Sequence, residues 1–320
     1  MSDLVLAPLV DYGFMRTGLL AALIVGGCCA LLSCLLVVRG RSLLGDAVSH
    51  SVLLGVVIGY LVGGEFGILP GAMLVAAVSG AAISFVARRT PLEAETAMGV
   101  VFTPLFALGL AIISVVQPRG IDLFHVLFGN VLGVSPSDVW LTGVAAGLVV
   151  AVVLVGFRAF ELWSFDPVLA ACMGMRTGAM DHLFTALLSA AIVAALKTVG
   201  LVLVVAMLIL PGATAALVCR RLATMMALAV AVGMGSGVVG LYGSYHLDVA
   251  SGPAIVLAAS GAFVVVLLLA PRSGLLTGRW THWRLRTHRN GAVGGTSPTT
   301  DPLGTDQVSD ATIRASSEHT

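Results

Sequence analysis

The feature that most constrains this chain is a succession of long apolar runs separated by short polar segments. A helix needs about 20 apolar residues to cross the hydrocarbon core of a bilayer. Hydrophobic residues make up 58% of the chain and charged residues 10%, against about 25% charged residues in a soluble domain. One aqueous core cannot bury so much apolar surface. We therefore expect an all-α polytopic membrane protein.

The apolar runs predict about eight to nine membrane-spanning helices. The count is not fixed by hydropathy alone, because the runs at 182–197 and 199–219 could form one long broken element. The predicted spans cover residues 17–38, 47–64, 67–87, 97–116, 139–157, 182–197, 199–219, 223–241 and 252–270.

Arginines follow every second run, and this alternation orients the predicted spans. Loops rich in arginine and lysine stay in the cytoplasm. Nine spans then place the N-terminus outside and the C-terminus in the cytoplasm. An eight-span count would break the alternation, so the charges favour nine. The arginines concerned are Arg39, Arg41, Arg88, Arg89, Arg158, Arg176, Arg220, Arg221, Arg272 and Arg279.

The character of the chain changes after the last run, which divides it into a transmembrane domain at 1–272 and a tail at 273–320. The basic, aromatic stretch at 279–289 either lies on the anionic inner leaflet or is an ordinary positive flank of the last span. From Asn290 onward large apolar residues almost disappear, so we expect a disordered cytoplasmic tail.

Asp46 and His50 lie four residues apart just inside the second apolar run. One helical turn separates them, so both side chains share a face. Ionisable groups at membrane depth are costly and usually mark pathways or pairs. A carboxylate with an imidazole suits manganese, iron or zinc, and weak binding by so few ligands suits a conduit that must release its ion. Alternatively, the two side chains bond to each other without metal, or lie at the membrane interface close to Arg41.

Other polar groups fall in the predicted loops. Asp122 with His125, and His246 with Asp248, lie in outer loops, where they either guide a cation, contact a binding protein or are ordinary polar loop residues. On the cytoplasmic side, Asp166 is predicted to cap a short helix that starts at Pro167. This cytoplasmic insert either docks a partner or simply connects two spans.

The sequence gives no reason to expect an enzyme. It has no Gly-x-x-x-x-Gly-Lys-Ser/Thr loop to cradle phosphates, so any ATP that drives this chain must be hydrolysed by a separate subunit. No arrangement of nucleophile and base predicts catalysis within the membrane. We expect no permanently bound cofactor and no nucleic-acid partner.

Several blocks in order resemble one family, the permease subunits of metal-type ABC importers for manganese, zinc and iron. The resemblance runs from about residue 5 to 271. The blocks are "LLGDAVSHSVLLGVVIGYLVG" (43–63), "LFGNVLGVSPSDVW" (127–140), "FDPVLAACMGM" (165–175), "VGLVLVVAMLILPGATAALV" (199–218) and "SYHLDVASGPAIVL" (244–257).

This resemblance implies a homodimeric permease in the plasma membrane of a prokaryote. Two copies of a cytoplasmic ABC ATPase and an extracytoplasmic metal-binding protein would be its partners, beside membrane lipid. The resemblance implies that Asp46 and His50 contact the metal in the translocation path. It also implies an ATPase-coupling segment that includes Phe165, Asp166, Pro167, Ala170 and Gly174.

The resemblance favours manganese as the transported ion, with iron or zinc behind it. A histidine, His125, precedes the "LFGN" segment, which resembles the manganese/iron branch more than the zinc branch. The family often has proline where this chain has Leu54, so the local helix shape there is in question. The competing interpretation is an ATP-independent, proton-coupled transporter with Asp46 and His50 as a relay.

Overall fold

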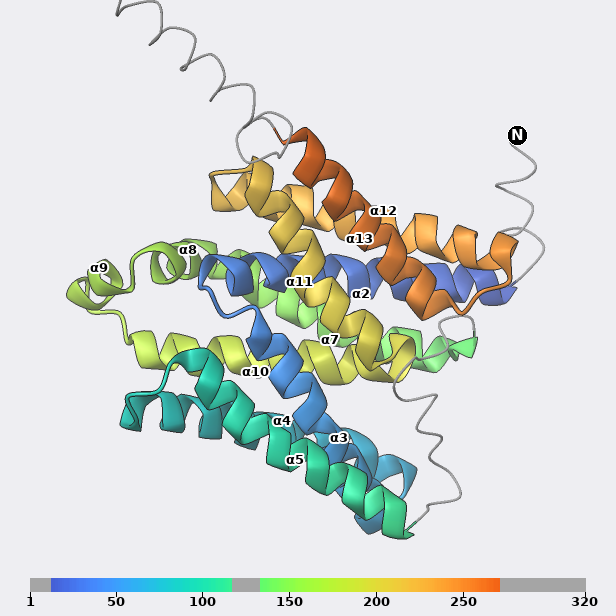
Figure 1. Cartoon of the computed structure of the whole chain (residues 1–320), viewed down its shortest axis with the longest axis horizontal. Helices are drawn as coiled ribbons and strands as arrows, with labels where there is room; N and C mark the ends of the chain where they lie inside the picture. The colour runs from blue at the N-terminus through green and yellow to red at the C-terminus, as the bar shows by residue number, and fades with distance from the viewer. Residues whose placement is uncertain (1–12, 117–132, 271–320) are drawn as a thin grey trace, which may run out of the picture. The chain divides into compact units, whose positions relative to one another are not determined.

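The computed structural model describes residues 13–116 and 133–270, and these fold into helices. Nine helices in this part of the chain are long and apolar enough to cross a membrane (Figure 1), which confirms the all-α membrane fold and the larger predicted count. The helices are α2 (Gly13–Val38), α3 (Leu43–Gly63), α4 (Glu65–Arg89), α5 (Ala94–Val116), α7 (Pro136–Val155), α8 (Phe157–Phe165), α9 (Pro167–Cys172), α10 (Thr177–Val199), α11 (Leu201–Val218), α12 (Leu222–Leu247) and α13 (Ser251–Leu269).

Helix α2 lies at the centre of the bundle. It packs on α11, α12 and α7, and 72% of its most apolar window is buried, against 17% for α13. Small residues make this position possible, because they let neighbouring backbones approach closely. A Cβ atom on Gly26 would lie only 2.9 Å from the backbone oxygen of Gly233 in α12. The α2–α12 contact is therefore built backbone against backbone.

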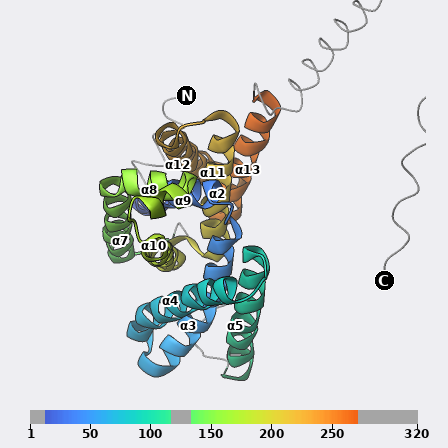
Figure 2. The ribbon, with the colours of Figure 1, turned by 90° about the vertical axis from the view of Figure 1, so that its left-hand side faces the viewer.

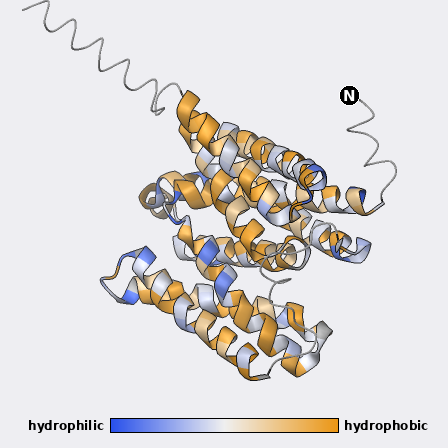
Figure 3. Cartoon of the chain, turned by 45° about the vertical axis from the view of Figure 1, so that its right-hand side comes forward, coloured by the Kyte–Doolittle hydropathy of each residue, from blue (hydrophilic) through white to orange (hydrophobic). Residues whose placement is uncertain are grey.

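Helices α3, α4 and α5 form a group that packs largely on itself (Figure 2). α3 contacts α4 along much of its length and also packs on α5. α10 and α11 join this group to the helices around α2. The helices are largely hydrophobic along their lengths (Figure 3), and many of their large apolar side chains are exposed, as a lipid-facing surface requires.

The runs at 182–197 and 199–219 form two helices rather than one. Gly200 separates α10 from α11 with a φ of 81°, a conformation that a residue with a side chain rarely adopts. Within α11, Pro211 cannot donate a backbone hydrogen bond. Beside it, the Ser33 hydroxyl of α2 accepts a hydrogen bond from the Gly212 N–H at 3.0 Å and donates to the Ile209 carbonyl at 3.3 Å. A side chain of the central helix thus supplies hydrogen bonds where α11 carries its proline.

The predicted helix ends differ from the observed ones by several residues. α2 begins at Gly13 rather than at 17, α10 begins at Thr177 rather than at 182, and α12 continues to Leu247 rather than ending at 241. Each extension mixes glycine and polar residues with its apolar ones, which continue a helix but interrupt its apolar run. Hydropathy therefore marks the membrane-embedded part of each helix and misses its ends.

Candidate functional site

Asp46 and His50 contact each other on α3. Asp46 lies in the first turn of the helix, and its Oδ1 is 3.1 Å from the His50 Nδ1. The same ring nitrogen lies 2.9 Å from the Asp46 backbone oxygen. The predicted shared face is confirmed. Both side chains keep part of their surface accessible, 31% for Asp46 and 26% for His50, so an ion could reach them.

The surroundings of the pair hold the imidazole in place. The rings of Phe102 and Phe106 from α5 lie 5.9 and 5.2 Å from that of His50, the second edge-on. The neighbouring hydroxyls of Ser49 and Ser51 donate to carbonyls of their own helix, so they are engaged away from the pair. In residues 13–116 and 133–270, no group of three or more His, Cys, Asp or Glu side chains could hold a metal ion. One copy of the chain therefore offers only two candidate side-chain ligands here.

A second polar cluster lies at the end of α2 nearest to α8. Asp181 of α10 contacts both Arg39 and Arg41, with its Oδ1 3.0 Å from Arg39 Nη2 and 3.1 Å from Arg41 Nη1. Arg39 also donates to the Trp163 backbone oxygen of α8 at 3.0 Å, and its guanidinium lies 4.1 Å from the centre of the Trp163 ring. Burial lowers the pKa of Arg39, and the charge of Arg41 acts in the same direction, while Asp181 opposes both.

The segment between α7 and α10 contains two short helices that lie together at one end of the bundle (Figure 1). Asp166 caps α9 as predicted, because its Oδ1 accepts a hydrogen bond from the Leu169 N–H at 2.8 Å and Pro167 opens the helix. Ala170 is buried and Phe165 is exposed, and Gly174 follows α9 with a φ of 83°. α9 exposes Val168 and Leu169, and Met173, the residue that follows α9, is also exposed.

Of the four residues predicted in outer loops, the structure describes two, His246 and Asp248. His246 lies in the last turn of α12 rather than in a loop, because that helix continues beyond its apolar run. Asp248 is the residue that ends the helix, in the left-handed conformation with a φ of 53°. Asp122 and His125 lie outside the described residues, as does the tail at 273–320.

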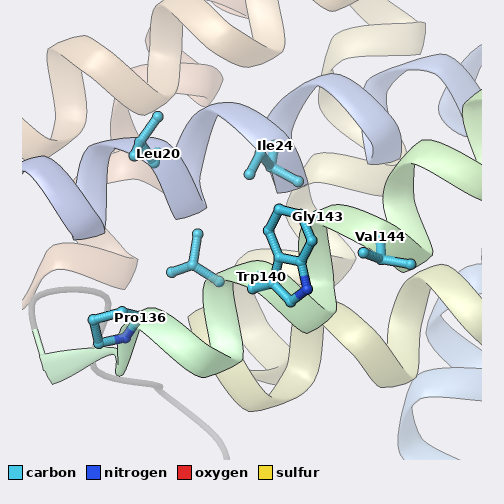
Figure 4. A pocket seen from close by; sticks show the side chains of 7 residues that line it. Leu20, Ile24, Pro136, Trp140, Gly143 and Val144 are labelled. Atoms are coloured by element: carbon cyan, nitrogen blue, oxygen red, sulfur yellow. The ribbon is translucent and has the colours of Figure 1, made fainter.

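An apolar cavity of about 490 Å³ lies between α2 and α7 (Figure 4). It holds no carboxylate, imidazole or thiol that could bind an ion, so it is not a second metal site. Its lining consists of Leu20, Ile24, Pro136, Val139, Trp140, Gly143 and Val144.

The sequence predicted the Asp46–His50 pair and the Asp166 cap but missed the Arg39–Asp181 contact. Arg39 and Arg41 fit the positive-inside pattern, so nothing in the sequence called for an acidic partner to explain them. Their partner lies 142 and 140 residues further along the chain. The available signal was an acid, Asp181, at the start of an apolar run on the same side of the membrane as the two arginines.

The nine apolar helices of the described residues define a polytopic membrane protein, and one of them carries an acid–imidazole pair. Residues 11–270 match the model of the ABC 3 transport family. The chain belongs to that family and has the fold of a metal-type ABC importer permease.

Three similar proteins illustrate the relationship. A "Manganese transport system membrane protein MntC" from Halalkalibacterium halodurans is 43% identical over 85% of this chain and 92% of its own length. A "Probable iron transport system membrane protein" from Haemophilus influenzae is 38% identical over 83% of this chain and 97% of its own. The solved structure of PsaBC from Streptococcus pneumoniae in complex with Fab has a TM-score of 0.78 at 33% identity, over 87% of this chain and 100% of that one.

Proposed function

We propose that this chain is the permease subunit of an ATP-driven importer that carries a divalent transition metal, manganese in the first place, into the cytoplasm. The observation that carries the proposal is the direct contact between Asp46 and His50 on a membrane-spanning helix, in a chain of the ABC 3 transport family. A carboxylate and an imidazole placed at membrane depth without an ion to handle would be costly to keep there.

The ligand chemistry supports a transition metal that is bound briefly. Carboxylate and imidazole together suit manganese, iron and zinc. Two side-chain ligands from one copy are too few for tight binding, and a second copy facing the first would bring four. A conduit must release its ion, so modest affinity is an advantage. The names of the similar proteins, which specify manganese or iron transport, support manganese first and iron second.

The proposed mechanism is alternating access in a homodimer. A metal-binding protein docks outside and releases its ion over the dimer axis, and the ion passes the Asp46–His50 level. ATP binding and hydrolysis in two cytoplasmic subunits then switch the path. The apolar side chains exposed on α9, which is too short to span a membrane, support a protein partner at Phe165–Gly174. The residues of this chain contribute ligands and gating and no bond-making step.

The proposal includes a location and an orientation. The permease lies in the plasma membrane of a prokaryote, with its N-terminus outside and its C-terminus in the cytoplasm. Residues 1–272 form the transmembrane domain, and residues 273–320 form the basic segment and the cytoplasmic tail. His246 and Asp248, at the end of α12, then face the side on which the binding protein docks, as do Asp122 and His125.

The test is uptake of radiolabelled manganese in cells that lack their own importer. The complete complex is expressed with wild-type permease, Asp46→Ala or His50→Ala, at matched membrane levels, with excess iron or zinc as competitors. Ser51→Ala is the matched control, since this hydroxyl lies one residue from His50 and donates to a carbonyl of its own helix. We expect both site variants to lose uptake while the ATPase stays bound, and the control to keep it.

The same experiment separates the alternatives. Normal uptake in both site variants would refute the metal role of Asp46 and His50. Uptake that continues without the ATPase and stops when the proton gradient collapses would favour the proton-coupled transporter. If the wild type imports no manganese but does import iron or zinc, that metal is the transported ion instead.

A further inference from the structure

We propose that Arg39 is a positioning residue that links the α8–α9 segment to the Asp46–His50 pair, so that movement of the one is passed to the other. The inference rests on the proposed function, because it assumes that the pair lies in the transport path and that a partner moves α8–α9. Asp181 and Arg41 complete this cluster, which we call the arginine clamp and define as Arg39, Arg41, Trp163 and Asp181.

The arginine clamp joins three separate elements. Arg39 follows the last residue of α2, donates to the backbone of Trp163 in α8, and contacts Asp181 of α10. Its guanidinium also lies against the Trp163 ring, which is itself buried between Phe160 and Phe184. Only 11% of the Arg39 side chain and 13% of the Asp181 side chain are exposed. A shift of α8 therefore displaces a buried cation, which must follow its partners because an unpaired buried charge is unfavourable.

The connection from Arg39 to the Asp46–His50 pair is a short turn that is hydrogen-bonded at both ends. The Arg41 N–H bonds to the Leu36 carbonyl and the Gly40 N–H to the Val37 carbonyl, which is the Schellman arrangement, with Gly40 at a φ of 62°. The Leu44 N–H then bonds to the Arg41 carbonyl, so α3 begins directly after this turn. Asp46 lies in the first turn of α3. A displacement of Arg39 is carried through a hydrogen-bonded turn into the helix that holds both metal ligands.

Two donors in the clamp remain available for another arrangement. Arg39 Nε and Trp163 Nε1 are buried and have no hydrogen-bond partner among the described residues. Arg39 and Arg41 also share a single carboxylate oxygen, Asp181 Oδ1. A buried network that is only partly satisfied stabilises its state less than a complete one does. The clamp can therefore exchange partners when α8–α9 moves, as a switching element requires.

The experiment measures manganese ions imported per ATP hydrolysed by the complete complex, with ATPase and binding protein, in proteoliposomes. Arg39→Lys keeps the charge but cannot bind Asp181, the Trp163 carbonyl and the Trp163 ring at once. Asp181→Asn removes the shared charge, and Asp181→Glu restores it. Arg220→Ala is the control, an exposed arginine after α11 that lies outside the clamp. All ratios are taken per assembled complex, so that a loss of folded protein alone leaves them unchanged.

We expect Arg39→Lys and Asp181→Asn to lower the number of ions imported per ATP by about threefold or more, the size expected when a coupling network is weakened. Asp181→Glu should recover part of that loss, and Arg220→Ala should match the wild type. Wild-type ratios in Arg39→Lys and Asp181→Asn, in complexes that import manganese, would overturn the inference. If Arg39→Lys does not assemble, the comparison of Asp181→Asn with Asp181→Glu decides it. A wild-type complex that imports no metal would instead refute the proposed function.

Discussion

The hydrogen bonds that Ser33 makes beside Pro211 give a sharp test of how the bundle is held together. Ser33 is fully buried, and its hydroxyl bonds to two backbone groups of α11, the Gly212 N–H and the Ile209 carbonyl. Ser33→Ala removes both bonds and leaves almost no cavity. Hydrogen bonds between membrane helices contribute about 0.6 kcal/mol each on average, and a buried donor left unpaired costs about 1–3 kcal/mol. We therefore expect the free energy of unfolding to fall by about 1–3 kcal/mol.

The chain offers a matched control for this substitution. Ser189 of α10 is also buried, but its hydroxyl has no hydrogen-bond partner among the described residues. Ser189→Ala should therefore leave stability unchanged or raise it slightly, because an unsatisfied polar group is removed. The measurement is unfolding of the purified permease by titration with SDS in mixed micelles, followed by circular dichroism. A change of less than about 0.5 kcal/mol for Ser33→Ala, or equal losses for both variants, would refute the reasoning.

Two further substitutions test local features near the proposed site. Gly40→Ala should destabilise the protein by about 1–2 kcal/mol, because a φ of 62° is strained for any residue with a Cβ atom; SDS unfolding beside Gly147→Ala, a helical position with open space around it, would show whether the backbone is the cause. Asp166→Ala should destabilise α9 by about 1 kcal/mol and speed amide exchange at Leu169, while Asp166→Asn keeps the cap. Equal exchange rates in the Ala and Asn variants would contradict the capping role.

The apolar spans and the contact between Asp46 and His50 could be predicted from the sequence because both depend on residues close together in the chain. A span is a local run of apolar residues, and two residues four apart meet on any helix. The short helix after Asp166 was predictable for the same reason, since an N-cap and a proline at the first position act within one turn.

The arginine clamp and the Ser33 bonds could not be predicted because they join residues far apart in the chain. Ser33 and Gly212 are 179 residues apart, and nothing in the apolar run around Ser33 specifies that α11 will lie against it. Arg39 and Asp181 are 142 residues apart. Such pairs depend on how the helices pack, and that packing is set by the shapes of small residues such as Gly26 and Gly233.

The burial of α2 has a consequence for how the protein is made. α2 is the first described span to leave the ribosome. Its main partners, α11 and α12, are among the last three described helices and end at Val218 and Leu247. At about 5–20 residues per second, roughly 10–40 s of synthesis separate the end of α2 from the end of α12. Throughout that interval its glycine-rich face meets lipid, or a chaperone in the membrane, instead of Gly233. If synthesis stops before α11, the inserted α2 lacks the helices on which it packs. We expect such a truncated chain to be degraded by proteases of the membrane.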